Sequence, residues 1–271
     1  MTFLRRLFRI FLVILWFLMT VVLVAVCNGW RRQWRGIRGA AFWTQLWAKV
    51  SARIIGMKVN VIGDPETAAG HLVISNHTGY LDVIAQGSVF PIRFAPKAEM
   101  RSWPLFGLLT ALSRPVWIDR KNPVKAAKIA GEIKATLEHG LSMLVYPEGT
   151  STDGRHGLLP FKSTAFEAAI QNRSPLLPVL IFHKEVPRGA FDPAWYGDVG
   201  FLPHIWGVLG LKEIHSCMYI MPEVTPQPGE SRKELARRMH RLMTEAYEEY
   251  SVLNGGGVET AVPDGGNVLQ S

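Results

Sequence analysis

The chain has 271 residues and a formal net charge of +8, so it is long enough for one large domain plus a further segment, and it favours anionic partners. It contains neither the Cys/His spacing of a zinc finger nor the aromatic and basic strand of an RNA-recognition motif, which argues against a nucleic-acid partner. Two cysteines, Cys27 and Cys217, are too few for a disulfide framework, and we expect the main domain to be cytosolic.

A long apolar run occupies residues 10–27, where Thr20 is the one polar residue. At about 1.5 Å per residue, this run approaches the ~30 Å hydrocarbon thickness of a bilayer. A cleaved signal peptide is the alternative, but the run exceeds the usual h-region of about 7–15 residues, and Arg31 and Arg32 stand where cleavage would occur. Arginines flank the run on both sides, as is typical of a segment held against anionic lipid headgroups. We therefore expect residues 1–30 to form a retained membrane anchor.

A second helical pattern occupies residues 31–56. Its apolar side chains recur at helical spacing, and basic side chains lie between them. The apolar positions are Trp43, Leu46, Trp47, Val50 and Ile54. Tryptophans suit the headgroup level of a membrane, so an amphipathic interfacial helix is the interpretation that we favour, with an ordinary core helix as the alternative.

Short β-type runs then alternate with helical patterns. Strands are predicted at residues 59–62, 72–75, 92–95, 116–118, 143–146, 176–182 and 218–221, and helices at 83–88, 103–112, 124–138 and 164–171. Such alternation indicates an α/β domain whose sheet is mixed and largely parallel and is flanked by helices. We place this domain at residues 57–250.

The C-terminal part of the chain divides into three stretches. Residues 183–213 are rich in Trp, Pro and Gly and break the alternation, which leaves open whether they cover a substrate or form a surface excursion. A final helix begins near Ser231, which makes a capping-box spacing with Glu234. The Gly-rich tail at residues 251–271 is expected to be disordered.

The first residues that suggest chemistry are His77 and Asp82, which follow the run at 72–75. On one continuous helix, five steps of about 100° would place the two side chains roughly 140° apart, so they could not meet. They can meet if His77 lies in a strand-to-helix turn and Asp82 in the first turns of the helix. Asp82 would then fix the imidazole tautomer, and the other ring nitrogen could take a hydroxyl proton. The spacing alone leaves a capping Asp beside a surface His as the alternative.

A second polar segment, Val-Tyr-Pro-Glu-Gly-Thr-Ser-Thr-Asp-Gly at residues 145–154, follows another predicted strand. In open α/β sheets, ligands bind beyond the carboxyl ends of the strands, so both polar segments are expected to line one crevice. Pro147 and Gly149 predict an irregular turn whose N–H groups could face an anion or a developing oxyanion. A solvated β-turn is the alternative.

Together, Asn-His-x-x-x-x-Asp at residues 76–82 and Tyr-Pro-Glu-Gly-Thr at 146–150 resemble motifs of the glycerophospholipid acyltransferases. The resemblance includes Pro-Val-Trp-Ile-Asp-Arg at 115–120 and Leu-Pro-Val at 177–179. It implies transfer of a fatty acyl group from acyl-CoA or acyl-carrier protein to the free hydroxyl of a lysophospholipid-like acceptor. It further implies no metal and no cofactor besides this co-substrate. With the anchor, it implies a membrane lipid as partner and a catalytic domain on the cytoplasmic face of the membrane, the inner membrane if the protein is bacterial.

The resemblance also implies roles for individual residues. His77 would be the general base and Asp82 its orienting partner. The acceptor site would contain Arg120, Glu148, Gly149, Thr150, Lys162 and Pro178. The pattern leaves the oligomeric state open.

One position departs from the family pattern. The Pro-Glu-Gly-Thr block usually continues with Arg, which helps to hold an acceptor phosphate, but here Ser151 follows. A missing guanidinium removes a strong, often bidentate phosphate contact, and Arg155, Lys162 and Lys97 are the candidates to replace it. In this respect the block is more similar to relatives that acylate lyso-ornithine lipids.

Three functions follow as expectations. The first is acylation of 1-acylglycerol-3-phosphate, giving phosphatidic acid, and the second is acylation of lyso-ornithine lipid or another lysolipid. A non-catalytic, lipid-binding relative is the alternative of another class. A lipase is disfavoured because the sequence has no G-x-S-x-G motif.

Overall fold

The computed structural model describes residues 2–28, 34–65, 70–103, 106–118 and 124–255. At its centre is a six-stranded sheet with the strand order β1-β6-β5-β2-β4-β3. The strands are β1 (Met57–Ile62), β2 (Leu72–Ser75), β3 (Ile92–Phe94), β4 (Ser142–Val145), β5 (Leu176–Val186) and β6 (Glu213–Ile220). Only β5 and β6 pair antiparallel among these strands, and the other neighbours pair parallel. The predicted mixed, largely parallel sheet is therefore confirmed.

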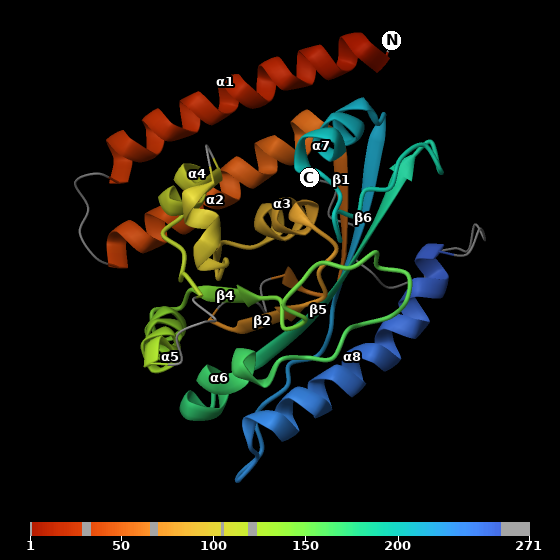
Figure 1. Cartoon of the computed structure of the whole chain (residues 1–271). Coiled ribbons are helices and arrows are strands. Elements are labelled where there is room, and N and C mark those ends of the chain that lie inside the picture. Colours follow the sequence, from red (N-terminus) through yellow and green to blue (C-terminus); the bar gives the residue numbers. More distant parts are fainter. Residues whose placement is uncertain (1, 29–33, 66–69, 104–105, 119–123, 256–271) are drawn as a thin grey trace.

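Helices cover both faces of the sheet (Figure 1). They are α1 (Thr2–Asn28), α2 (Trp34–Ile55), α3 (Tyr80–Val89), α4 (Phe106–Leu112), α5 (Val124–Glu138), α6 (Glu167–Asn172), α7 (Phe201–Gly210) and α8 (Arg232–Gly255), with 3₁₀ helices η2 (Ala98–Ser102) and η3 (Ser163–Phe166). Side chains alternate along a strand, so each strand contributes to the hydrophobic cores on both faces of the sheet. Leu72 and Ile74 pack toward α5, α6 and α8, whereas Val73 packs toward α2, α3 and α7.

Two expectations about elements change. The predicted strand at 116–118 is wrong, because Ile118 forms only an isolated bridge with Lys97. Pro96 has no N–H group to donate to the carbonyl of Val116, so a continuous ladder does not form there. The stretch at 183–213, for which no elements were predicted, contains the end of β5 and the whole of α7.

Helix α1 lies along α2 and α7 on the outside of the domain (Figure 1). Its Arg9 is buried and donates hydrogen bonds to the carbonyls of Leu209, Leu211 and Lys212 at 3.2, 2.6 and 3.1 Å. Arg5 donates to the carbonyl of Gly210. The last carbonyls of a helix have no partner within it, and cations there complement the helix dipole. Two arginines that precede the apolar run therefore fix α1 to the C-terminal end of α7.

Residues 2–24 form the stretch that, among the described helices, is long and apolar enough to cross a membrane. The expected anchor thus corresponds to α1 and the expected interfacial helix to α2, although residues 29–33 between them lie outside the described residues. Helix α8 continues to Gly255, and residues 256–271 of the expected disordered tail also lie outside them.

Candidate active site

His77 and Asp82 meet at the junction of β2 and α3. Strand β2 ends at Ser75 and α3 begins at Tyr80, so His77 lies in the connecting turn and Asp82 in the first turn of the helix. Nδ1 of His77 is 2.8 Å from Oδ2 of Asp82. The His77 side chain is 22% exposed and the Asp82 side chain 0%. The turn thus presents the imidazole while it hides the carboxylate.

Four further hydrogen bonds reach the carboxylate of Asp82. Its Oδ2 also accepts from the backbone N–H groups of Thr78, at 2.6 Å, and Gly79, at 3.0 Å. Its Oδ1 accepts from the Thr78 hydroxyl at 2.8 Å and lies 2.7 Å from Nε2 of His183. Burial alone would raise the pKa of Asp82, but hydrogen bonds from His183 and His77 outweigh burial and hold this pKa well below its ordinary value. The buried carboxylate is therefore ionised.

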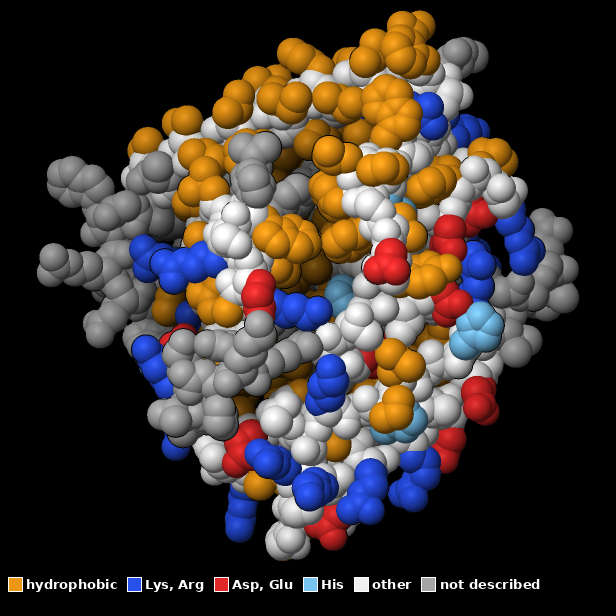
Figure 2. Space-filling view, viewed as in Figure 1, with side chains coloured by type: hydrophobic (Ala, Val, Ile, Leu, Met, Phe, Trp, Pro, Cys, Tyr) orange, Lys and Arg blue, Asp and Glu red, His pale blue; other side chains and the backbone are white. Residues whose placement is uncertain are grey.

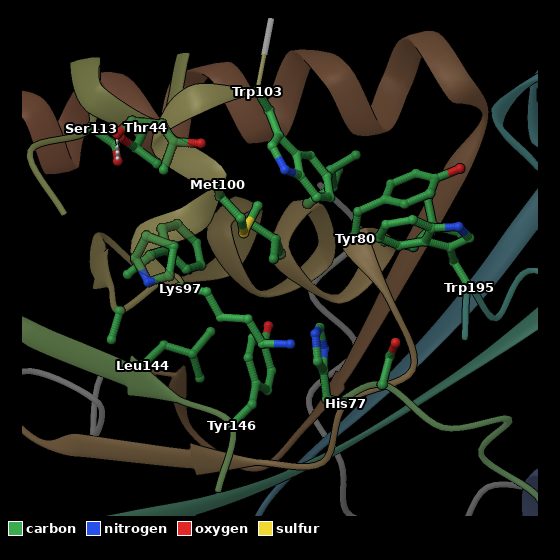
Figure 3. Close-up of a pocket in the computed structure, with 18 of the residues that line it drawn as sticks. Thr44, His77, Tyr80, Lys97, Met100, Trp103, Ser113, Leu144, Tyr146 and Trp195 are labelled. Carbon is green, nitrogen blue, oxygen red and sulfur yellow. Dashed lines mark hydrogen bonds between the residues drawn. The ribbon is translucent and has the colours of Figure 1, made fainter. Parts of the chain in front are cut away.

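The ionised carboxylate determines the tautomer of His77. A carboxylate only accepts, so Nδ1 of His77 carries the proton and Nε2 keeps its lone pair. The ring of Tyr146 stacks on the imidazole at a centroid distance of 4.0 Å (Figure 3), and its hydroxyl donates to Oε1 of Gln86 at 2.9 Å. The imidazole is thus held by its neighbours, with Nε2 in the position to act as a base.

Glu148 holds the second polar segment against the first. Its Oε1 accepts from the backbone N–H of His77 at 3.0 Å and its Oε2 from that of Leu159 at 2.9 Å. The backbone N–H of Thr152 in turn donates to the carbonyl of His77 at 2.9 Å. Burial raises the pKa of Glu148 to about 6, against the opposing effect of the two backbone hydrogen bonds. Both oxygens of this predicted acceptor-binding residue contact protein backbone.

Gly149, Thr150 and Lys162 come together beside His77 on the wall of one cavity. Gly149 has a φ of 77°, which favours glycine, and the side chain of Lys162 lies directly against it. The backbone N–H of Lys162 donates to the carbonyl of Pro147 at 2.9 Å. The fold thereby brings a lysine from the far end of the segment to the predicted site.

The cavity beside His77 has a volume of about 1750 Å³. Figure 2 shows its opening between apolar side chains on the side of α1 and basic side chains below it. The apolar wall comes mainly from α1, α2 and α7, with Val13, Phe17, Trp43, Trp47, Ile205 and Val208 among its residues. Lys97, Ser151 and Lys162 contribute polar groups to the cavity wall. Figure 3 shows Lys97 on the same side of the cavity as His77 and Tyr146. An apolar chain and a polar head could therefore be held on the two sides of His77.

Part of the stretch at 183–213, between Trp195 and Leu209, lines this cavity, which favours a covering role over a surface excursion. The backbone N–H of Trp195 donates to the carbonyl of Thr78 at 2.7 Å, and its ring lies near Tyr80 and Trp103 at the cavity (Figure 3). A Cβ at Gly79 would lie 3.0 Å from the backbone nitrogen of Trp195, so this glycine permits the close approach of the two segments.

Two predicted site residues are not among those that the structure brings to His77. Arg120 lies outside the described residues. Pro178 is buried in β5, opposite Ile74 of β2, and its carbonyl accepts from the backbone of Met221 at 3.0 Å. It is absent from the residues that line the cavity in the described part of the chain.

Sequence reasoning missed three residues that position the site. His183 binds Asp82, and Tyr146 stacks on His77. The side chain of Asn76 exchanges two hydrogen bonds with the backbone of Ile181 in β5, at 2.9 and 2.8 Å. The available signal for His183 was a polar residue directly after the buried run at 176–182.

Known proteins resemble this chain in sequence and in fold. A family model described as Acyltransferase matches residues 58–182. The 1-acyl-sn-glycerol-3-phosphate acyltransferase of Neisseria gonorrhoeae is 32% identical over 151 residues, which are 55% of this chain and 58% of that protein. The crystal structure of the 1-acyl-sn-glycerophosphate acyltransferase PlsC from Thermotoga maritima has a TM-score of 0.64 at 19% identity, covers 92% of this chain and 96% of that one, and shows the same fold.

A longer match comes from the lyso-ornithine lipid O-acyltransferase of Brucella abortus. It is 31% identical over 225 residues, which cover 78% of this chain and 80% of that protein. The family-model match contains both His77 and Asp82. From the extent of these matches, the chain belongs to the acyltransferase family and is an acyltransferase.

Proposed function

We propose that this enzyme moves a fatty acyl group from a thioester donor to the free hydroxyl of a lysolipid, with His77 as general base. The observation that carries the proposal is the imidazole of His77, oriented by the buried, ionised Asp82 and placed at a large, mostly apolar cavity. An acyl chain needs such a cavity, and a hydroxyl nucleophile needs such a base.

The proposed reaction runs in two steps. Nε2 of His77 takes the proton of the acceptor hydroxyl while the hydroxyl oxygen attacks the thioester carbonyl. This step forms a tetrahedral oxyanion beside an imidazolium. The oxyanion then collapses, the carbon–sulfur bond breaks, and the imidazolium returns the proton to the leaving thiolate. The products are an ester and a free thiol, and His77 ends neutral. General-base action of this kind contributes about 10²–10⁴ to a rate.

The segment of Thr150 and Ser151 is the proposed site of oxyanion stabilisation, since the N–H of the preceding Gly149 already donates to the carbonyl of Tyr146. It lines the cavity beside His77, and Glu148 and Thr152 fix it through their bonds to the His77 backbone. Backbone N–H groups held rigidly near a developing negative charge lower the barrier because they need no reorganisation. A thioester is already activated, so the proposal requires no covalent intermediate on the enzyme.

We propose lyso-ornithine lipid as the acceptor. Two observations favour it over 1-acylglycerol-3-phosphate: Ser151 supplies no guanidinium for a phosphate, and the match to the Brucella abortus enzyme covers far more of both chains than the Neisseria gonorrhoeae match. The phospholipid remains the second candidate because Lys97 and Lys162 line the cavity and could bind a phosphate. The donor is proposed to be acyl-CoA or acyl-carrier protein.

The exposed surface supports attachment to a membrane. Among the large hydrophobic side chains that are exposed in the described residues, all but Leu159 lie on α1, α2, α4 or α7 or directly before α4 or α7. In Figure 2, apolar side chains gather along the upper edge of the molecule, above the cavity opening. Apolar surface of this extent on one side indicates a lipid partner. We propose that α1 anchors the enzyme with its catalytic domain on the cytoplasmic face.

A transfer assay in detergent tests the function. Labelled acyl-CoA and acyl-carrier protein are each offered with lyso-ornithine lipid, with 1-acylglycerol-3-phosphate, or with no acceptor. The proposal expects product only when an acceptor is present, and more product from lyso-ornithine lipid. Thioester loss without an acceptor would indicate a hydrolase, and a preference for 1-acylglycerol-3-phosphate would replace the proposed acceptor.

His77→Ala tests the base. Its transfer rate should fall at least about 10²-fold, since a general base contributes that much. His156→Ala is the matched control, because the His156 side chain is 86% exposed and pairs with Asp153 at the surface. Equal rates in the two variants would remove His77 from the mechanism.

A further inference from the structure

His183 is a buried histidine that the proposed mechanism does not use. It lies in β5 directly opposite Ser216 of β6, and its side chain is 2% exposed. Nε2 of its ring is 2.7 Å from Oδ1 of Asp82, and Nδ1 is 2.7 Å from the hydroxyl of Ser216. One buried carboxylate therefore stands between two imidazoles, His77 on one side and His183 on the other.

The two partners of His183 determine which of its ring nitrogens is a hydrogen-bond donor. Since the Asp82 carboxylate accepts only, Nε2 of His183 carries a proton and donates a hydrogen bond to the carboxylate. The Ser216 hydroxyl can donate to a bare Nδ1 or accept from a protonated one, so both ring nitrogens are satisfied in either charge state. A bond from an N–H donor to a buried carboxylate is among the stronger hydrogen bonds of proteins.

The donors to Asp82 differ in where they come from. Thr78, Gly79 and His77 all belong to the turn that carries the base itself, so their bonds cannot fix this turn relative to the sheet. Of the hydrogen bonds to Asp82 in the described residues, that of His183 comes from a sheet strand. Rotation about the terminal torsion of an Asp side chain is soft. Oδ1 of Asp82 is bonded to the Thr78 hydroxyl, which moves with the turn, and to His183, which ties the carboxylate plane to the sheet.

We propose that His183 is a positioning residue for the reaction: held by Ser216, it fixes the carboxylate of Asp82 and thereby the imidazole of His77. This inference rests on the proposed function. A histidine that merely fills the core would affect stability alone. A positioning histidine also affects the rate once substrates are bound, because misorientation of the base costs rate in the bound complex.

Two amide variants separate these roles. In His183→Gln, the amide nitrogen can reach the place of imidazole Nε2 and still donate to Asp82. In His183→Asn, the shorter amide reaches only the place of Nδ1, toward Ser216. Both variants place a neutral amide in the same buried site, so they are matched in polarity. The measurement is kcat and KM for the lysolipid and the thioester, together with the thermal unfolding midpoint, on the full chain in detergent.

The inference expects kcat to fall about tenfold in His183→Asn, to stay within about threefold of wild type in His183→Gln, and KM to change little in either. Wild-type kcat in the asparagine variant would overturn it. So would equal losses of kcat in both variants, because the bond to Asp82 that glutamine keeps and asparagine lacks would then make no difference to the rate.

Ser216→Ala keeps the imidazole and removes its second partner, and it covers the case that His183→Asn does not fold. It should lower kcat about two- to fivefold at unchanged KM. Unchanged kcat in Ser216→Ala with a misfolded asparagine variant would overturn the inference. A wild type that acylates no lysolipid overturns the proposed function and this inference with it. An active wild type with unaffected variants overturns the inference alone.

Discussion

Asp82→Asn removes a charge from the site while it leaves most contacts possible. The amide oxygen should occupy the place of Oδ2, because His77, Thr78 and Gly79 all donate there. The amide NH₂ then faces the Thr78 hydroxyl and His183, both of which can accept after a rotation or a change of tautomer. The variant is therefore expected to fold, with the tautomer of His77 preserved.

The size of the effect follows from the geometry. During transfer His77 becomes an imidazolium whose Nδ1 is 2.8 Å from Oδ2 of Asp82, which places the centres of the two charges about 4 Å apart. At an effective dielectric constant of about 20, two such charges interact by about 4 kcal/mol. The asparagine lacks this attraction, so kcat should fall about 10³-fold, since each 1.36 kcal/mol corresponds to a factor of ten.

Initial rates of acyl transfer at saturating substrates measure this effect. Asp192→Asn is the matched control, because Asp192 pairs with Arg155 at the surface, and its rate should stay within about twofold of wild type. A folded Asp82→Asn enzyme that lost less than tenfold would refute the reasoning, since the charge of Asp82 would then contribute less than about 1.4 kcal/mol to the transition state, against the expected value of about 4 kcal/mol.

Four further predictions concern other parts of the molecule. Glu148→Gln leaves one of two backbone N–H groups facing an amide donor. It should therefore lower the free energy of unfolding by about 1–3 kcal/mol, as measured by denaturation. Unchanged stability with a raised KM for the acceptor would show instead that Glu148 binds the acceptor directly. The folded-state pKa of Glu148 is raised from 4.5 to about 6, so its contribution to stability is present below about pH 4.5 and lost as the pH rises through 6. The difference in unfolding midpoint between wild type and Glu148→Gln should therefore shrink over this range. A difference that grows would contradict the shift. Ser151→Arg should raise the rate with 1-acylglycerol-3-phosphate relative to lyso-ornithine lipid in the transfer assay, and an unchanged ratio would separate this position from acceptor choice. Arg9→Met should speed amide hydrogen exchange at the C-terminal end of α7, and unaltered exchange would mean that the bonds of Arg9 do not hold the two helices together.

The sheet was largely predictable because its central strands are buried on both faces and therefore read as short apolar runs. Residues 72–75 and helix 124–138 were expected at the bounds that the structure has. Helix α7 was not predicted, because Pro203 and two glycines within it are poor helix formers, and its apolar residues face a cavity and the surface rather than one core. Tertiary packing decides such a helix.

At the site, local geometry was predictable and long-range partners were not. The contact of His77 with Asp82 follows from a turn of a few residues, so the spacing could suggest it. His183 lies 101 positions from Asp82, and its contact depends on how β5 pairs in the sheet. Glu148 in a Pro–Gly turn suggests a ligand, yet its hydrogen-bond partners are backbone groups that only the folding of two loops brings near.

The attachment of α1 to α7 has a consequence for the order of synthesis. Arg9 leaves the ribosome 202 residues before the carbonyl of Leu211. Until α7 has been synthesised, the emerging α1 must therefore be bound by lipid or by another protein. His77, Asp82, Tyr146 and His183 are all translated earlier than this partner. A chain released prematurely would thus carry these four side chains but would lack α7, which forms part of the cavity wall.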